Sequence, residues 1–412
     1  MRGEYKTPGG KLVAVNIEVD GSGLPVSCVI DGDFFIDTDD DDDDAQALLA
    51  QLGKALVGGS SLEDVFAAHP STTLVGAGAH ALREAYRRAF AKTNVDLDGS
   101  NGEVAVGPSY DTSISALDNI PGKTSGKAPD KTVKNVAHAP LDANLDSFSA
   151  NFQTVKPAGV EFLTGAGDAD IEKHKILRQW HLRWNSLRPK VVVDSPRSPA
   201  EQMEVDARWA REVAEGERPA TLRFWNWSGP AVVVGRFQSI DDEVDLETAR
   251  REGFEVVRRP TGGGAMFVEP AGVITFSLYV PSAFVEGMSV PQSYEFLDLW
   301  LVEALRELGL DVGFSGMNDI ASSRGKIGGT AQRRYPSRDG SGGSILHHVT
   351  LDYSIDAGKM SRLLKTSPEK RRDKAVKSAV KSVDPLKRQT GMTRGQLVAH
   401  LVSRASRRYN IN

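Results

Sequence analysis

The segment of this 412-residue chain best suited to chemistry runs from Arg258 to Ala265 and reads Arg-Arg-Pro-Thr-Gly-Gly-Gly-Ala. It follows a predicted strand at 254–257. Three consecutive glycines weaken a strand, but their backbone can approach a ligand closely and present N–H groups to an anion. The two arginines add charge-assisted donors for the same anion. The segment therefore predicts a site for a carboxylate or a phosphate, with a plain turn as the ordinary alternative for a glycine run.

A second candidate segment places Lys326 between glycines, in the sequence Gly-Lys-Ile-Gly-Gly-Thr-Ala-Gln. The flexible stem of a lysine can carry a point charge into a site, where it bridges a carboxylate and a phosphate under attack. Asn318-Asp319 lies upstream, and its aspartate can hold Mg²⁺. In isolation, however, Lys326 would be an ordinary solvated lysine and Asn318-Asp319 an ordinary turn.

Two adjacent histidines, His347 and His348, lie in a predicted strand that spans residues 344–353. Neighbouring residues of a strand point to opposite faces of its sheet, so the pair is not expected to bind one metal ion. We therefore expect a structural role for each histidine.

The elements that position these residues fall into two regions with a linker between them. Residues 1–95 are interpreted as a small α+β unit, because apolar residues alternate in two stretches and recur at three- and four-residue spacing in two others. Residues 96–165 are rich in Asp, Ser, Asn, Pro, Gly and Lys without a sustained period, which predicts a linker. In the N-terminal unit the expected strands are 11–19 and 26–35, and the expected helices are 45–56 and 81–90.

The C-terminal region, residues 175–412, alternates strands and helices and carries all three candidate segments. Apolar residues on one face of an amphipathic stretch from Tyr294 to Leu308 predict a long helix packed against a sheet. Together the two regions indicate the α+β fold class. The other expected elements are strands at 221–227, 231–234, 254–257 and 272–279 and a helix at 244–251.

The composition matches an ordinary soluble globular protein, with 40% hydrophobic and 25% charged residues. No apolar stretch reaches the ~20 residues that a membrane span needs, and the N-terminus has no signal-peptide core. We therefore expect a cytoplasmic protein that does not enter a membrane. The only cysteine, Cys28, excludes an intramolecular disulfide.

Charge is unevenly distributed, although the formal net charge is only -5. Residues 39–44 are consecutive aspartates, whose mutual repulsion favours a solvated turn or loop over a metal site. Residues 358–412 carry 15 Lys or Arg residues against three acids. Because this tail has one aromatic residue for base stacking, Tyr409, it favours a partner-binding or phosphate-facing surface over a nucleic-acid site.

Taken together, the three segments resemble the catalytic domain of lipoate-protein ligases, within the biotin and lipoate ligase superfamily. The resemblance extends from about residue 180 to about residue 385 and includes the stretches 219–225 and 234–238. It implies a mixed β-sheet flanked by helices. One departure is Val268, which stands where many members of the family carry histidine.

The resemblance also implies a role for each segment. Lys326 would be the catalytic residue, in contact with the acyl carboxylate and the α-phosphate of ATP. Asn318 and Asp319 would serve the Mg-ATP side, with Asp319 as the Mg²⁺ ligand. The implied acyl-adenylate site comprises Arg258, Thr261, Gly262, Gly263, Gly264, Ala265, Gly329 and Thr330.

The function that the resemblance implies is that of an ATP-dependent lipoate-protein ligase. Such an enzyme activates lipoate or octanoate as acyl-AMP and transfers the acyl group to a lysine of an apo lipoyl-domain protein. The expected cofactors are ATP and Mg²⁺. The expected partners are 2-oxoacid dehydrogenase acyltransferase subunits and the glycine-cleavage carrier protein, and the chain is expected to be a monomer.

Two other functions stay open. An octanoyltransferase on the same fold would take its acyl group from acyl carrier protein through a cysteine thioester, for which Cys28 is the only thiol. A non-catalytic relative would bind lipoyl domains or lipoate without turnover, and the retained Lys326 argues against it. Biotin ligases are less similar, because their Arg- and Gly-rich loop ends in a tryptophan.

The N-terminal unit resembles the accessory domain of the same family, through the stretches 3–6, 8–13 and 32–35. In the common arrangement that domain follows the catalytic domain, whereas here it precedes it. We expect the N-terminal unit to dock over the active site and help to close it. An autonomous, tethered unit is the alternative.

Overall fold

The described elements of the N-terminal and C-terminal regions pack against each other. The predicted linker at 96–165 and the first half of the aspartate run, 39–41, lie outside the residues that can be described. No helix in the described part of the chain is long and apolar enough to cross a membrane. The computed structural model describes residues 1–38, 42–91, 168–365, 369 and 383–409.

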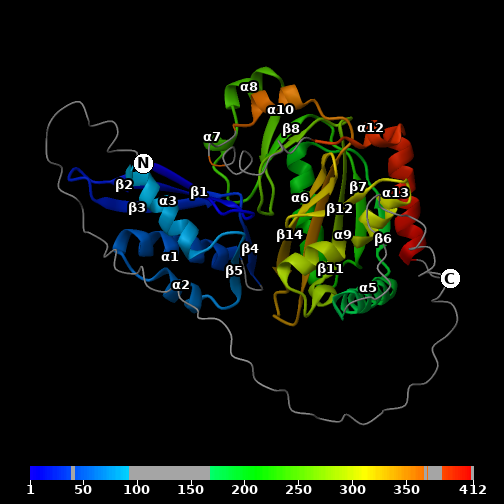
Figure 1. The fold of residues 1–412 in the computed structure, drawn as a ribbon, viewed down its shortest axis with the longest axis horizontal. Helices are drawn as coiled ribbons and strands as arrows, with labels where there is room; N and C mark the ends of the chain where they lie inside the picture. The colour runs from blue at the N-terminus through cyan, green and yellow to red at the C-terminus, as the bar shows by residue number, and fades with distance from the viewer. Residues whose placement is uncertain (39–41, 92–167, 366–368, 370–382, 410–412) are drawn as a thin grey trace, which may run out of the picture. The chain divides into compact units, whose positions relative to one another are not determined.

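The N-terminal domain is an α+β unit built on an antiparallel sheet in the order β1-β2-β3 (Figure 1). Alternate residues of β2, Val13, Val15 and Ile17, are buried against α1 and α3, as the period of two predicts. A short pair of strands, β4 and β5, completes the domain. The elements are β1 (Arg2–Lys6), β2 (Leu12–Val19), β3 (Pro25–Gly32), β4 (Phe35–Thr38), α1 (Asp42–Gly58), α2 (Leu62–Ala68), β5 (Thr72–Val75) and α3 (Ala79–Ala91).

Two expectations for this domain are corrected by the structure. The predicted strand at 26–35 is two strands, because the chain leaves the first sheet after Gly32 and pairs again only from Phe35 onward. The aspartate run is not entirely a loop, because residues 42–44 form the first turn of α1. The helix dipole favours negative charge at a helix N-terminus, so the end of the aspartate run is compatible with the start of a helix.

The C-terminal domain is built on a seven-stranded mixed sheet in the order β12-β13-β14-β15-β11-β7-β6. Only the edge pair β6 and β7 is parallel. The predicted strands at 221–227, 272–279 and 344–353 are β7, β11 and β15. The strands are β6 (Lys190–Val193), β7 (Thr221–Trp225), β11 (Val273–Pro281), β12 (Val312–Ser315), β13 (Asp319–Ser322), β14 (Gly325–Pro336) and β15 (Gly343–Asp352).

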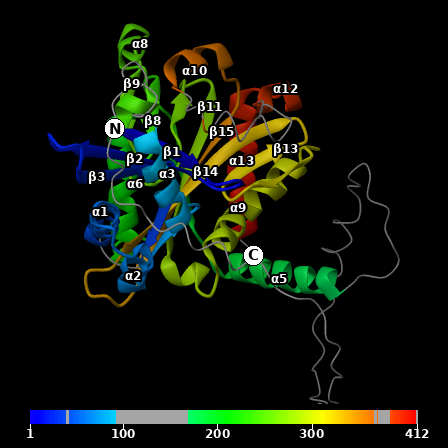
Figure 2. The same cartoon turned by 60° about the vertical axis from the view of Figure 1, so that its left-hand side comes forward.

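Helices cover both faces of this sheet (Figure 2). Phe224 and Phe276 alternate out of β7 and β11 onto Trp300 of α9, in the core that α5 and α13 also cover. Helix α6 covers the other face, where Tyr279 meets Trp209. The helices are α5 (Asp168–Ser186), α6 (Pro199–Ala214), α9 (Val290–Arg306), α12 (Leu386–Thr390) and α13 (Arg394–Tyr409), with a 3₁₀ turn η1 (Ser282–Val285).

A second sheet, in the order β10-β8-β9, holds the glycine run between its strands β9 and β10. Its apolar side chains, among them Val232 and Phe267, pack against short helices. These elements are β8 (Ala231–Val234), α7 (Ile240–Glu243), α8 (Leu246–Arg251), β9 (Glu255–Arg258), β10 (Met266–Val268) and α10 (Ala357–Leu363). The predicted α+β fold class, with a mixed sheet flanked by helices, is confirmed.

Candidate active site

Arg258, at the end of β9, holds the loop that follows β8. Its Nη1 donates to the carbonyl oxygens of Gly235, Arg236 and Gln238, at 2.8, 2.9 and 2.7 Å. Three carbonyls that converge in a loop need a donor, and one guanidinium supplies it. Arg258 thus contacts backbone oxygens of the protein, in a position where the sequence predicted a ligand anion.

Arg259 fixes the glycine loop from within. This buried guanidinium donates from Nη2 to the carbonyls of Gly262 and Gly264, at 2.7 and 2.9 Å, and from Nε to the hydroxyl of Thr261 at 3.1 Å. Burial lowers the pKa of Arg259 to about 10. Ala265, the last residue of the segment, packs into the apolar cluster of the small sheet. The loop is therefore a rigid part of the site.

Thr261 continues this network into the main sheet. Its Oγ1 lies 2.7 Å from Nε2 of His348, and Nδ1 of the same ring lies 2.9 Å from Asp206 on α6. Burial lowers the pKa of His348, although Asp206 opposes this shift. A neutral imidazole then donates from Nδ1 to the carboxylate and accepts the threonine hydroxyl at Nε2. Thr261 is 1% exposed, so this chain of bonds anchors the glycine loop.

Asp206 is the centre of a buried polar cluster under the loop. It accepts hydrogen bonds from Ser277, at 2.9 Å, and from the hydroxyl of Tyr279, at 2.6 Å. Nη1 of Arg223 lies 3.3 Å from it, and the same guanidinium donates to Asp194 at 2.8 Å. A buried charge is tolerated only when it is paired and hydrogen-bonded, and this cluster meets that condition.

The paired histidines lie on opposite faces of β15, as predicted. His348 faces α6, whereas Nε2 of His347 lies 2.8 Å from Asp298 on α9. Each ring has its own carboxylate partner, which confirms the expected structural role.

Lys326, at the start of β14, has its ammonium group 2.7 Å from Oδ1 of Asp319 on β13. The lysine side chain is 36% exposed, so it remains accessible from outside. A Cβ atom at Gly329 would stand 2.9 Å from this ammonium group, so a larger residue there would shift the ammonium group from its present place. The backbone of Lys326 forms a β-bridge with Val383 and accepts the amide of Asp384 at 2.8 Å.

Asn318 and Thr330 fix the β13–β14 hairpin next to Lys326. The side-chain amide of Asn318 donates to the carbonyl of Thr330 at 2.7 Å, and the amide of Thr330 donates back to the carbonyl of Asn318 at 2.9 Å. In this register Asp319 lies opposite Gly329. The hairpin thus brings together all of the predicted site residues of the second segment.

The N-terminal domain contacts the glycine loop directly. The amide of Gly263 donates to the carbonyl of Phe34 at 3.3 Å, and a Cβ atom at Gly262 would stand 2.6 Å from the same oxygen. The ring of Phe35 packs against Tyr294 on α9, with centroids 5.8 Å apart. These contacts explain the glycines, because a side chain at 262 would push the two domains apart. These contacts agree with the expected docking of the N-terminal unit, and its role in closing an active site stays a prediction.

The N-terminal domain also joins the two halves of the site. The ammonium group of Lys11 donates to Oδ1 of Asn318 at 2.8 Å. Oδ2 of Asp33 lies 3.8 Å from the place a Cβ atom would take at Gly264. Lys11 and Asp33 also interact electrostatically with each other. The glycine loop and the Lys326 hairpin therefore meet through residues of the first domain.

The Mg²⁺ role that the resemblance implies for Asp319 stays a prediction, because Mg²⁺ is usually held by one or two carboxylates together with substrate phosphates. In this structure its carboxylate is paired with the ammonium group of Lys326 at 2.7 Å. In the part of the chain that the structure describes, no group of three or more His, Cys, Asp or Glu could hold a metal ion. The neighbouring carboxyl group, Asp352 at the end of β15, has its pKa raised to about 7 by burial, with Asp319 adding to the shift and Lys326 opposing it. We derive no step through a metal here.

Cys28, the only cysteine of the chain, lies on β3 in the N-terminal domain. Its half-buried side chain packs against the core of that domain, and burial raises the pKa of its thiol to about 11. A thiol with this pKa is almost entirely protonated near neutral pH. The catalytic domain therefore has no thiol of its own.

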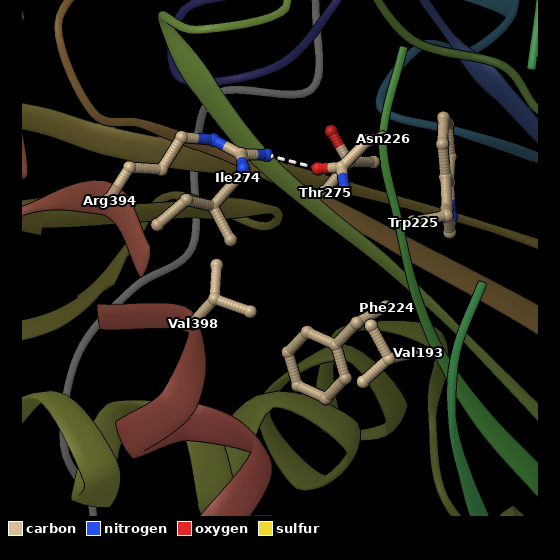
Figure 3. Close-up of a pocket in the computed structure, with 8 residues that line it drawn as sticks. All are labelled: Val193, Phe224, Trp225, Asn226, Ile274, Thr275, Arg394 and Val398. Carbon is tan, nitrogen blue, oxygen red and sulfur yellow. Dashed lines mark hydrogen bonds between the residues drawn. The ribbon is translucent and has the colours of Figure 1, made fainter. Parts of the chain in front are cut away.

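A cavity lies between helix α13 and the face of the main sheet that this helix covers (Figure 3). Its volume is about 10 Å³, which is room for about one water molecule and not for an eight-carbon chain. Arg394 crosses it to hydrogen-bond with Asn226. It is lined by Val193, Phe224, Trp225, Asn226, Ile274, Thr275, Arg394 and Val398.

Sequence reasoning missed several residues that complete the site. Lys11 and Asp33 stood inside the stretches that resemble the accessory domain, but nothing in their spacing gave them a role. Asp206 and Arg223 were also missed, although an arginine in the middle of the apolar strand Thr-Leu-Arg-Phe-Trp was a usable signal. A charge in a buried strand needs a buried partner, which predicts a polar cluster behind it.

Comparisons with known proteins match this region of the chain. The model of the lipoyl protein ligase A/B catalytic domain matches residues 198–405. "Octanoyltransferase LipM" of Symbiobacterium thermophilum is 33% identical over 187 residues, which are 40% of this chain and 65% of that protein. The enzyme of the same name from an Exiguobacterium species is 30% identical over 197 residues, which are 42% of this chain and 67% of that protein. The chain thus spans about two thirds of the length of these relatives.

Among solved structures, the fold is similar to a bi-partite lipoate protein ligase of Thermoplasma acidophilum. The TM-score is 0.45 and the sequence identity is 25%, over 55% of this chain and 85% of the other.

These comparisons correct one expectation from the sequence. The relatives named above are octanoyltransferases, which contradicts the expectation of an ATP-dependent lipoate-protein ligase that forms acyl-AMP. The error has a physical origin. A lysine in a glycine-flanked loop beside an anion-binding loop suits any acyl transfer in which negative charge develops at the carbonyl, so those residues do not by themselves distinguish the two reactions.

Proposed function

Because the chain belongs to the family of the lipoyl protein ligase A/B catalytic domain, we propose that it is an acyltransferase that moves an octanoyl or lipoyl group from a thioester donor to a lysine of another protein. The names of its relatives support an octanoyl group. The observation that carries the proposal is the accessible ammonium group of Lys326, held by Asp319 and given room by Gly329.

The transfer proceeds directly from donor to acceptor, without an acyl-enzyme. The amine of the acceptor lysine attacks the thioester carbonyl, a C–N bond forms, and the C–S bond breaks as its electron pair leaves on sulfur. The amine gives up one proton, which the leaving thiolate takes. A direct step is favoured because the chain's one thiol, Cys28, lies on β3 with a raised pKa, and a thiolate is the form that attacks.

Lys326 stabilises the negative charge that develops on the carbonyl oxygen in this step. A preorganised donor aimed at that oxygen is worth roughly 10²–10³-fold in rate. Asp319 holds the ammonium group of Lys326 in place before the donor arrives, at 2.7 Å. The buried network from Thr261 through His348 to Asp206 keeps the facing glycine loop rigid.

The acceptor is a lysine of an apo lipoyl-domain protein. The resemblance to lipoate-protein ligases and the octanoyltransferase names support this class. The acyltransferase subunits of 2-oxoacid dehydrogenases and the glycine-cleavage carrier protein are the members to test first.

The test uses the full chain with an apo lipoyl domain and three separate donors, and follows acylation of the domain by intact mass. The first donor is octanoyl acyl carrier protein, the second is free octanoate with ATP and Mg²⁺, and the third is free lipoate with ATP and Mg²⁺. We expect product from the thioester donor and intersecting, sequential initial-rate patterns. Parallel, ping-pong patterns would contradict direct transfer, and no product with the thioester donor would contradict the proposed function.

A non-catalytic binding protein would behave differently in the same experiment. It would bind the apo lipoyl domain without acylating it with any donor. The control for the role of Lys326 is the variant Lys326→Met. Methionine keeps the length of the stem and removes the charged ammonium group.

A further inference from the structure

Lys11 enters the site from a rigid turn of the N-terminal domain. Its amide donates to the carbonyl of Gly76 at 2.7 Å, and its carbonyl accepts the amide of Thr7 at 3.3 Å. A Cβ atom at Gly76 would stand 2.3 Å from Cγ of Lys11, so this glycine makes room for the lysine stem. The hydrogen bonds of its amide and its carbonyl thus fix the backbone of Lys11, and with it the direction in which the side chain leaves the N-terminal domain.

The head of Lys11 lies over the catalytic hairpin. Its ammonium group donates to Oδ1 of Asn318 at 2.8 Å and lies 4.8 Å from the ring centroid of Phe35. Burial lowers its pKa to about 8, while the charges of Asp33 and Asp319 oppose that shift. Burying an ammonium group is costly unless it is hydrogen-bonded or paired with an opposite charge. The hydrogen bond to Asn318 is therefore needed to hold the ammonium group of Lys11 in this buried place.

Asn318 passes this constraint to Lys326. Its backbone and side chain both bond Thr330 across the hairpin, and its neighbour Asp319 holds Lys326. The side-chain oxygen of Asn318 is occupied by Lys11, and its side-chain amide by Thr330. An asparagine bonded at both ends cannot rotate, and the hairpin that carries Asp319 is fixed with it.

We propose that Lys11 is a positioning residue of the transfer site, which acts through Asn318 to place the ammonium group of Lys326, held by Asp319, where negative charge develops on the acyl carbonyl oxygen. The N-terminal domain is then part of the active site rather than only a cover over it. This inference rests on the proposed acyl transfer for its kinetic test, and has a second test that does not depend on transfer.

The kinetic test compares Lys11→Met, Asn318→Ala and the double variant in the full chain, with octanoyl acyl carrier protein and an apo lipoyl domain. Lys11→Met keeps the length of the stem and removes the charge and the donor. We expect it to lower kcat at least ~10-fold with little change in the KM of the acceptor, because a misplacement of about 1 Å costs up to ~100-fold. In the Asn318→Ala background the same substitution should change kcat less than twofold.

Two kinetic results would overturn the inference. One is a Lys11→Met variant with kcat within twofold of the wild type. The other is a double variant whose loss is the product of the two single losses, which would show that Lys11 does not act through Asn318. The matched control is Lys54→Met on the exposed face of α1, which should leave kcat unchanged. If Lys11→Met fails to fold, Lys11→Gln replaces it throughout.

The second test measures amide hydrogen exchange in the hairpin without any substrate. The amide of Thr330 bonds the carbonyl of Asn318, so loss of the Lys11 contact should speed its exchange. We expect faster exchange in the peptide 318–332 of Lys11→Met and unchanged exchange in Lys54→Met. Unchanged exchange in Lys11→Met would overturn the inference whatever the activity. Faster exchange in a protein that transfers no acyl group would instead overturn the proposed function alone.

Discussion

Among the pairs of a basic residue and an aspartate in the C-terminal domain, two differ in almost every other respect. Arg223 and Asp206 are both 0% exposed, and each has several hydrogen-bond partners. Lys326 and Asp319 are 36% and 17% exposed and lie at the meeting point of two domains. A buried pair must be fully bonded to be tolerated, which makes it a fixed part of the fold. The accessible pair can exchange partners when a substrate arrives, which is the property that the proposed role of Lys326 requires.

The largest effect is expected from Asp206→Ala in the buried pair. Arg223 keeps Asp194 as a carboxylate partner, but the buried hydroxyls of Ser277 and Tyr279 lose their acceptor together with one partner of Arg223, so the free energy of unfolding should fall by about 3–5 kcal/mol. Denaturant unfolding followed by tryptophan fluorescence measures it. The matched substitution in the accessible pair, Asp319→Ala, should cost less than ~1 kcal/mol. Equal losses for the two variants would break the comparison.

The next effect concerns activity and has the opposite pattern. Lys326→Met should lower the rate of acyl transfer by roughly 10²–10³-fold, because it removes the donor at the developing oxyanion. Its melting temperature should stay within a few degrees of the wild type, since the side chain is partly exposed. A variant that keeps its activity, or loses it only by unfolding, would remove Lys326 from the proposed mechanism.

A smaller effect should appear as a pH dependence of stability at Asp352. Its pKa in the folded protein is raised to about 7, so the folded state holds the proton longer than the unfolded state does. The folded protein is therefore fully stabilised by protonated Asp352 at pH values below the pKa that this carboxyl has in the unfolded chain. This stabilisation is lost as the pH rises through about 7. Asp352→Asn should therefore raise the melting temperature by about 5 °C at pH 8.5 and change little at pH 4.

The control for that measurement is Asp339, whose pKa is lowered to about 2 by the amide and hydroxyl of Ser341 and the hydroxyl of Ser337. Asp339→Asn should destabilise the protein at pH 7, and the difference should shrink as the pH falls toward 2. A stabilising effect of both substitutions at high pH would point to net charge rather than to the environment of Asp352.

The smallest effect is expected at Cys28, which lies far along the chain from either pair. Cys28→Ser should keep the transfer rate within twofold of the wild type, because the thiol is not used in direct transfer. Treatment of the wild type with iodoacetamide at neutral pH should also leave the rate unchanged, since the raised pKa keeps the thiol protonated. A large loss in either experiment would favour an acyl-cysteine intermediate.

The sequence predicted much of the fold, because its strongest signals are local. The alternation in β2, the valine run of β8 and the amphipathic period of α9 each lie within one element and need no information from elsewhere. The strand expected at 26–35 was wrong because its division after Gly32 is set by pairing with β5, forty residues downstream in sequence. Long-range pairing of that kind is not written in a local pattern.

The site could be predicted only in part, for the same reason. The hairpin residues from Asn318 to Thr330 were found, since they lie together in sequence as well as in space. The arginines were assigned to a ligand because a sequence cannot show that Arg258 and Arg259 face converging carbonyls of their own loops. Lys11 was overlooked because its partner, Asn318, is 307 positions away.

The backbone of Lys326 has a consequence for where the chain can be cut. Its carbonyl accepts the amide of Asp384, and it forms a β-bridge with Val383, on the far side of residues 370–382. Asp384 in turn accepts the hydroxyl of Ser322 on β13. Strand β14, which carries Lys326, and strand β13, which carries Asp319, are therefore both tied to a late segment of the polypeptide. A recombinant piece that stops before Val383 would keep every predicted site residue. It would lose the backbone contacts of Lys326 with Val383 and Asp384.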